Sequence, residues 1–156
     1  MMMQQIIETV RSLDGALVLV PEPGSSHPEI AWGDAFCYYA PDGQVPSGQP
    51  YATIVTKDYP GDTGSDLDPP GRWRVNIQVD KATFHRLTGE EDPRHPAPRD
   101  FAESDVVLPH PVYGAIGWIA VVNPADRTGD LVLGLLRRAH ADARARHDRR
   151  DAVTGR

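Results

Sequence analysis

Residues 72–80 read Arg-Trp-Arg-Val-Asn-Ile-Gln-Val-Asp, so apolar and polar side chains alternate along this segment. A period of two matches a β-strand, in which successive side chains point to opposite faces of a sheet. The pattern predicts a strand that buries Trp73, Val75, Ile77 and Val79 and turns its polar side chains to water. A chain that contains such a strand needs neighbouring strands, and it needs a cover for the apolar face.

Other apolar runs predict the neighbouring strands. Residues 16–20 and 35–39 are short, β-prone and followed by turn residues, and residues 51–56 are rich in β-branched side chains. The turn residues between the second and third of these runs predict a hairpin with a wide loop. Residues 116–122 supply a further strand, which an Asn-Pro pair ends.

Helices are indicated where apolar residues recur every three or four positions. This spacing predicts helices at residues 3–14, at residues 81–88 and from about residue 129 onward. Asp80 is expected to cap the middle helix and Gly89 to end it. We therefore predict one α+β domain over residues 1–148, with residues 149–156 as a frayed tail. Its antiparallel sheet has about five strands, with the N-terminal, middle and C-terminal helices packed on one face.

The sequence predicts a cytoplasmic protein. Its only cysteine, Cys37, rules out an internal disulfide and lies in an aromatic run, where a thiol usually packs as a small hydrophobe. The first residues lack the basic and apolar regions of a signal peptide. Apolar runs such as residues 16–20 are far shorter than the roughly 20 residues that a bilayer requires, so no membrane partner is expected.

The charge distribution weakens a role in nucleic-acid binding. The 156 residues carry a net charge of −6, whereas contacts to phosphates require a basic surface. Residues 137–156 differ from the rest, because they contain seven arginines and three aspartates. If the chain binds nucleic acid, we expect Arg137, Arg138 and Arg144 to contact the phosphates.

The segment Pro109-His110-Pro111 is the most distinctive local feature. The prolines restrict the backbone on both sides and present the imidazole from a rigid loop near Tyr113 and Trp118. Such a ring is suited to bind a small anion, to coordinate a metal or to transfer a proton. The alternative is a histidine that bonds to the backbone and pins the loop. The residues alone do not decide between these roles.

The polar side of the 72–80 strand supplies further ligand-binding candidates. Arg74 and Asn76 either form the floor of a ligand site or belong to the solvated side of the sheet, and the solvated side is the commoner case. His85 is a further candidate. If the histidines form a metal site, we expect it mainly where His85, His95 and His110 lie close together in space.

Motifs of the common enzyme classes are absent from the sequence. It contains no Gly-x-Ser-x-Gly, Gly-x-Gly-x-x-Gly or Walker motif, and its histidines lack zinc-site spacing. The aspartates of residues 58–71 do not follow the pattern of a calcium loop, so we expect a flexible acidic loop there. We therefore predict no catalytic residue, no metal and no cofactor.

The second half of the chain resembles a known family in the order of its elements. Residues 72–80, a short helix, a proline-bearing loop, Gly117-Trp-Ile-Ala-Val121 and a terminal Leu-rich helix are similar to the YjbR/MmcQ family of small bacterial domains. The resemblance covers about residues 35–148, and it implies a frataxin-like sheet described as a double-wing DNA-binding fold. The chain departs from the family in its acidity and in its segment Leu108-Pro-His-Pro-Val-Tyr-Gly114, which points to an actinobacterial branch.

Two functions fit these features. The leading hypothesis is a non-enzymatic binding module of the YjbR/MmcQ type that takes a small ligand or nucleic acid. The alternative is a small-molecule-binding protein or small enzyme. It would use His110 as acid or base and Arg74 to hold an anion, with Tyr113 or Trp118 as a wall. A third hypothesis is a homodimer that forms through an exposed sheet edge.

Overall fold

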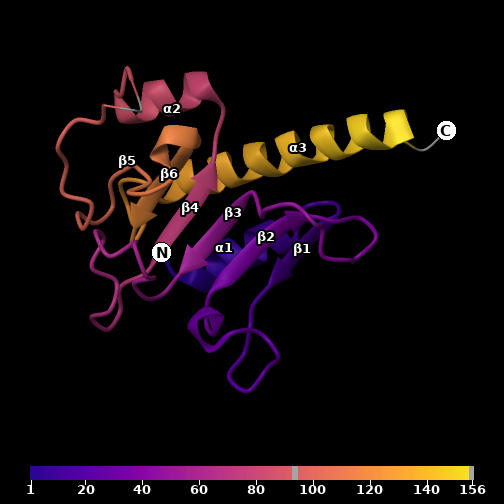
Figure 1. The fold of residues 1–156 in the computed structure, drawn as a ribbon, viewed down its shortest axis with the longest axis horizontal. Coiled ribbons are helices and arrows are strands. Elements are labelled where there is room, and N and C mark those ends of the chain that lie inside the picture. Colours follow the sequence, from indigo (N-terminus) through magenta and orange to yellow (C-terminus); the bar gives the residue numbers. More distant parts are fainter. Residues whose placement is uncertain (93–94, 155–156) are drawn as a thin grey trace.

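The computed structural model describes residues 1–92 and 95–154. Its helices are α1 (Met3–Arg11), α2 (Lys81–Thr88) and α3 (Gly129–Thr154), with short 3-10 helices η1 (Glu29–Ala31) and η2 (Gly114–Ile116). Its strands are β1 (Ala16–Leu19), β2 (Ala35–Tyr39), β3 (Ala52–Val55), β4 (Arg74–Gln78), β5 (Leu108–Pro109) and β6 (Trp118–Val122). These strands form one antiparallel sheet in the order β1-β2-β3-β4-β6-β5 (Figure 1). The predicted α+β architecture is confirmed, with one strand more than expected.

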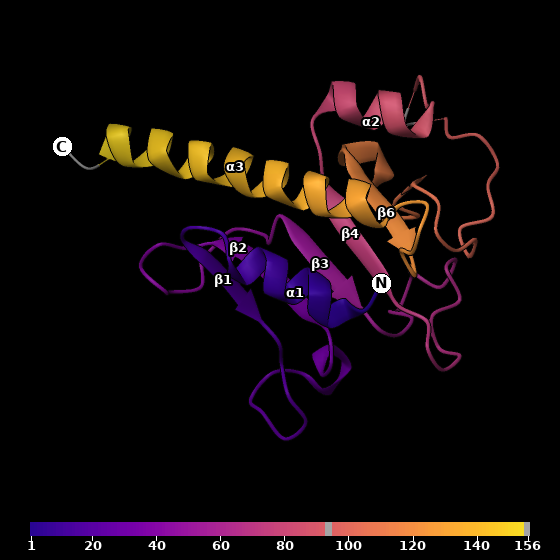
Figure 2. The ribbon, with the colours of Figure 1, turned by 180° about the vertical axis from the view of Figure 1, so that it is seen from behind.

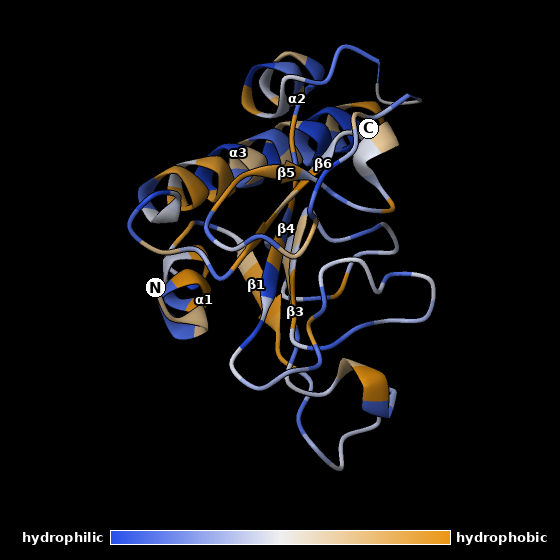
Figure 3. Ribbon diagram, turned by 90° about the vertical axis from the view of Figure 1, so that its left-hand side faces the viewer, coloured by the Kyte–Doolittle hydropathy of each residue, from blue (hydrophilic) through white to orange (hydrophobic). Residues whose placement is uncertain are grey.

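The helices cover one face of this sheet. Seen from behind, α1 and α3 lie across the strands, and α2 lies at the β5–β6 end (Figure 2). The edge-on view places α1 and α3 on one side of the mostly apolar strands and many of the irregular loops on the other (Figure 3). Val75 and Ile77 of β4 are fully buried in the same cluster as Ile6 of α1 and Leu136 of α3. The burial of each such side chain stabilises the fold by roughly 1.5–3 kcal/mol.

The cysteine lies in this core. Cys37 of β2 is 1% exposed, and burial raises the pKa of its thiol to about 12, against a smaller lowering effect of Arg11. A thiol with so high a pKa remains protonated, and its thiolate is the reactive form. The prediction that Cys37 packs as a small hydrophobe is therefore confirmed.

The opposite face of β4 is not solvated, and the prediction that its polar side chains face water is wrong for two of them. Arg74 and Asn76 are only 1% and 3% exposed. Side chains from residues 58–71 and from the segment around His110 lie over them. Asp62 and Ser65 accept hydrogen bonds from Arg74, and His110 Nε2 lies 3.1 Å from Arg74 Nη2. Alternation along the strand predicted which residues share a face, but it carried no information about what covers that face.

Residues 58–71 form an ordered loop that its own hydrogen bonds hold in place, called the tied loop below. The composition of the segment had suggested a flexible acidic loop. The backbone N–H of Asp58 donates to Asp68 Oδ1 at 2.9 Å, and the N–H of Leu67 donates to Asp58 Oδ1 at 2.9 Å. Leu67 and Ser65 are each 1% exposed. Aspartate side chains that accept from nearby backbone groups are typical of ordered turns.

The additional strand, β5, lies in the segment that the sequence assigns to an irregular connection. Its Pro109 has no N–H to donate, and proline is tolerated in a strand at the edge of a sheet, where β5 lies. Just before β5, Asp105 accepts hydrogen bonds from the backbone N–H groups of Ala125 (2.8 Å) and Thr128 (3.0 Å). Although desolvation opposes it, such hydrogen bonding lowers the pKa of Asp105 to about 2. The connection is thereby fixed to the start of α3.

Two helix ends differ from the predicted ones. α1 ends at Arg11 rather than at residue 14, because Ser12 caps the helix and its hydroxyl donates to the carbonyl of Thr9 at 2.6 Å. α3 continues to Thr154 through most of the segment predicted to fray, and Arg144 and Asp148 form an i,i+4 ion pair (3.8 Å) on its outer turns. The last two residues of the chain lie outside the described ranges. Within those ranges, no helix is both long enough and apolar enough to cross a membrane.

Candidate functional site

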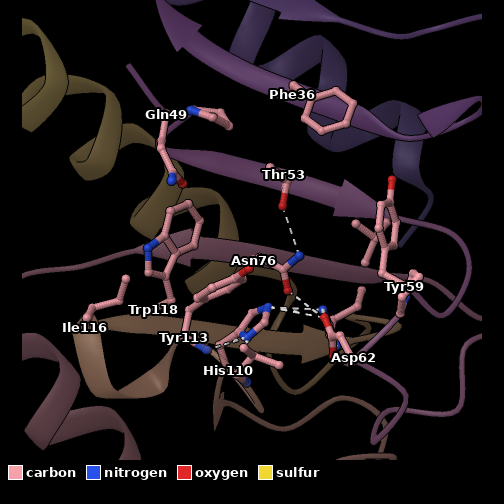
Figure 4. A pocket seen from close by; sticks show the side chains of 16 residues that line it. Phe36, Gln49, Thr53, Tyr59, Asp62, Asn76, His110, Tyr113, Ile116 and Trp118 are labelled. Atoms are coloured by element: carbon pink, nitrogen blue, oxygen red, sulfur yellow. Dashed lines mark hydrogen bonds and ion pairs between the residues drawn. The ribbon is translucent and has the colours of Figure 1, made fainter. Parts of the chain in front are cut away.

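A cavity of about 300 Å³ opens on the face of the sheet that the helices leave free (Figure 4). The strand register places Phe36, Thr53 and Asn76 in one row across β2, β3 and β4, and these residues line its base. Trp118 and Ile116 lie at one end, and Tyr59 lies at the other. The volume is at the lower end of the range of small-molecule sites, roughly 300–1,000 Å³.

Arg74 is the central polar residue of the cavity floor. Its guanidinium forms a bidentate pair with Asp62, from Nη1 to Oδ1 (3.0 Å) and from Nη2 to Oδ2 (2.5 Å). Nη1 also donates to Ser65 Oγ (2.9 Å), and Nε donates to Asn76 Oδ1 (2.7 Å). Burial alone would raise the pKa of Asp62, but the hydrogen bonds and charge of Arg74 outweigh it and hold that pKa below its usual value. The pair is therefore ionised and carries no net charge.

His110 is held in one tautomer by the loop that it pins. The backbone N–H groups of Val112 and Tyr113 both donate to its Nδ1 at 3.0 Å. A nitrogen that accepts hydrogen bonds carries no proton, so the neutral ring bears its hydrogen on Nε2. Burial, and then the charge of Arg74, lower the pKa of His110 to about 4 against the opposing effect of Asp62. The imidazole is therefore neutral near pH 7.

The protonated side of this ring faces the floor of the cavity. His110 Nε2 lies 3.1 Å from Arg74 Nη2 and 3.8 Å from Asp62 Oδ2. Because both nitrogens carry hydrogen, the shorter contact joins two donors and is not an ordinary hydrogen bond. The floor thus presents two N–H groups side by side.

The stability of the fold is expected to depend on pH through His110. Its pKa is 6.5 when unperturbed and about 4 in the folded chain, so the unfolded state binds the proton first as the pH falls. The stabilising contribution is complete above pH 6.5 and is lost between pH 6.5 and 4, by up to roughly 1.4 kcal/mol per pH unit. Urea unfolding at half-unit pH steps measures this slope.

The matched variant for this measurement is His110→Asn. The Asn Oδ1 atom can accept the same two backbone hydrogen bonds as the imidazole Nδ1, but the amide does not titrate in this range. We expect a flatter stability profile for the variant between pH 6.5 and 4. Identical profiles for the two proteins would show that His110 does not carry the pH dependence.

The structure brings together most of the residues that the sequence analysis selected. Arg74, Asn76, His110, Tyr113 and Trp118 all line the cavity. For His110, one ring nitrogen accepts the backbone hydrogen bonds that pin the loop, and the other lies at the cavity.

The sixth candidate does not join the cavity. His85 lies on α2, and its Nδ1–H donates to the backbone carbonyl of Glu90 at the end of that helix. In the described parts of the chain, no group of three or more His, Cys, Asp or Glu side chains is arranged to hold a metal ion. His85 therefore acts on the local backbone and does not contribute to the site.

The arginines selected as nucleic-acid contacts lie on α3, away from the cavity lining. Arg138 pairs with Asp142 (3.1 Å) and lies 3.7 Å from Asp80. Arg144 pairs with Asp14 (3.3 Å) in addition to its partner on the same helix. Arg137 is exposed on the same helix. Carboxylates thus accompany two of the three arginines.

Sequence reasoning did not select the polar partners of Arg74 and Asn76. Asp62 and Ser65 come from the tied loop, and Thr53 of β3 accepts a hydrogen bond from Asn76 Nδ2 (2.9 Å). Asp62 was one of several aspartates in an acidic segment, and no spacing rule distinguished it from the others. The sequence places Thr53 in a predicted strand, but only the strand register shows that Thr53 lies beside Asn76.

Comparison with known protein families gives one finding. A family model described as a family of unknown function, DUF6194, matches residues 1–152. The chain belongs to DUF6194. Searches of curated proteins and of solved structures find no match. The DUF6194 match extends over the whole sheet, all three helices up to residue 152 and every residue of the cavity described above.

Proposed function

We propose that this DUF6194 chain is a non-enzymatic binding domain that takes a small molecule in the cavity on the free face of its sheet. The observation that carries the proposal is the combination of a buried polar floor with largely apolar walls in one hollow. Sites for small molecules usually have this composition, with a few polar groups that orient the ligand. The floor is rigid, because Arg74 is bonded to Asp62, Ser65 and Asn76.

Binding is favoured over acid–base catalysis by the state of His110. A general base needs a free lone pair, but Nδ1 accepts from two backbone groups and Nε2 carries the hydrogen. A general acid at neutral pH needs a proton to release, but the lowered pKa keeps the ring neutral. Asp62 is a weak base for the same electrostatic reason, since Arg74 stabilises its ionised form.

A small ligand is favoured over nucleic acid by the charges on α3. The carboxylates beside Arg138 and Arg144 offset the positive charge that phosphate contacts require. The resemblance to the YjbR/MmcQ family and the cytoplasmic location stay predictions from the sequence. Neither is needed for the proposed ligand site.

The test is a fragment screen by NMR with the isotope-labelled full chain. We expect small aromatic fragments to shift the indole N–H signal of Trp118, which lines the cavity. The indole N–H of Trp32 is an internal control, because it donates to the carbonyl of His27 and Trp32 does not line this cavity. Fragments that shift neither signal, or both equally, would contradict the proposed site.

The same protein tests the nucleic-acid hypothesis. A duplex of 20 base pairs, added in 50 mM salt, is expected to leave the backbone signals of Arg137, Arg138 and Arg144 unchanged. Signals of these arginines that shift at low salt and return at high salt would favour nucleic-acid binding instead.

A further inference from the structure

The hydrogen-bond inventory of the cavity floor shows what kind of ligand atom fits there. Arg74 has five N–H groups, and four of them have acceptors on Asp62, Ser65 and Asn76. The fifth, on Nη2, points toward His110 Nε2, which itself carries a hydrogen. Both side chains are at least 95% buried, so neither group is freely solvated. Buried donors without a good acceptor are costly, and an oxygen placed against both would relieve that cost.

We propose that the floor recognises a neutral carbonyl oxygen of a flat, largely apolar molecule, such as an aryl ketone or amide. This inference rests on the proposed function and specifies its ligand class. The oxygen would accept from Arg74 Nη2 and His110 Nε2 together, and the ring of the ligand would lie between the aromatic side chains of the cavity.

A neutral oxygen is favoured over an anion because the positive charge of Arg74 is already matched. Asp62 occupies the guanidinium in a bidentate pair, and His110 adds no charge. An incoming carboxylate or phosphate would lie near the Asp62 carboxylate, which repels it, and would lose its own hydration. The expectation from sequence that Arg74 holds an anion is therefore replaced by a different use of the same side chain.

A flat ligand is favoured by the walls. Trp118 and Tyr59 border opposite ends of the cavity, and Phe36 lies beside Thr53 on the neighbouring strand (Figure 4). The His110 and Tyr113 rings lie 4.9 Å apart at their centroids, so Tyr113 extends the aromatic lining on the side of the donors. Aromatic faces favour planar partners through stacked and edge-to-face contacts.

The experiment compares three probes of similar size, each titrated into the full chain and followed at the indole N–H signal of Trp118. Acetophenone carries a neutral carbonyl, benzoate carries a carboxylate, and toluene carries no oxygen. We expect acetophenone to bind about tenfold more tightly than either of the others, because it alone satisfies the two donors without charge repulsion. His110→Asn should weaken acetophenone by about tenfold, because the Nε2–H donor is lost, and should weaken toluene by a smaller factor, because toluene uses no donor.

Asp62→Asn provides a more decisive test, because it removes the negative charge that neutralises Arg74. Benzoate should then bind more tightly than acetophenone, whereas Asp66→Asn, the same change at an exposed position of the same loop, should leave the preference as it is. Folding of each variant is checked by the dispersion of its backbone signals.

The outcomes separate the two proposals. If none of the three probes shifts the Trp118 signal, the ligand site itself is contradicted. If benzoate binds the unmodified chain as tightly as acetophenone, or more tightly, the carbonyl inference is overturned while the site stands. If Asp62→Asn leaves the preference for acetophenone unchanged, the inference is overturned as well, because charge matching by Asp62 would not determine the ligand class.

Discussion

Asp34→Ala is expected to lower the free energy of unfolding by about 3–5 kcal/mol. The Asp34 carboxylate at the start of β2 is completely buried, and Oδ1 accepts from Lys57 Nζ (2.9 Å) and from both the N–H (2.9 Å) and the hydroxyl (2.6 Å) of Thr56. The hydroxyl of Tyr59 donates to Oδ2. The pKa of Tyr59 is raised mainly by burial, and also by its hydrogen bond to Asp34 and by the charge of Asp34. The Tyr59 hydroxyl therefore keeps its proton. Removing the carboxylate leaves an ammonium group and three donors without their shared acceptor.

Urea unfolding followed by circular dichroism measures this loss. Asp42→Ala is the matched control, because the Asp42 carboxylate lies in an exposed turn and accepts only from the N–H of Gln44 among the described residues. We expect the control to change stability by less than about 0.5 kcal/mol. A loss below about 1 kcal/mol in Asp34→Ala would mean that water replaces the carboxylate and that the cluster does not hold the loop before β2.

Arg74→Met is expected to destabilise the fold by about 3 kcal/mol. Methionine fills much of the space of the arginine side chain, but it leaves the carboxylate of Asp62 and the polar atoms of Ser65 and Asn76 without their partner. The Asp62 side chain is 15% exposed, so water offsets part of the cost. The prediction is checked by the same unfolding measurement.

The double variant Arg74→Met/Asp62→Leu separates an unpaired charge from lost packing. Replacing both members of a buried ion pair by apolar side chains is often close to neutral, so the double variant should recover most of the stability lost in Arg74→Met. A double variant that is less stable than Arg74→Met would indicate that the ion pair itself stabilises the fold. In both variants we expect the neutral-carbonyl probe to lose its preferred binding.

The main elements were predictable because their signals are local. The alternation of residues 72–80 predicted β4, and Asp80 with Gly89 predicted the limits of α2, where Asp80 Oδ1 accepts from the N–H of Thr83 at 2.8 Å. β5 was missed because its two residues, Leu108 and Pro109, are too few to show a period of their own. Its pairing with β6 creates the strand, and that pairing is a long-range contact.

The site was predictable only in part, for the same reason. Arg74 and Asn76 were assigned to one face by alternation, and His110 was selected because two prolines hold its backbone. Asp62, which determines the charge of the floor, reaches Arg74 only when the loop of residues 58–71 folds back over the sheet. No local pattern encodes that closure, so the burial of Arg74 and the tautomer of His110 became clear only in three dimensions.

One face of β2 and β3 packs in the core and the other lines the cavity. This separation affects how members of the family can diverge. Cys37 and Ile54 belong to the core, whereas Phe36 and Thr53, one position away in each strand, line the cavity. If the proposed ligand site is correct, substitutions at Phe36 or Thr53 would alter ligand preference with little effect on the packing beneath the helices. Under that proposal, positions 36 and 53 are the first to compare among DUF6194 proteins, because relatives with the same folding core would differ there in the molecules that they bind.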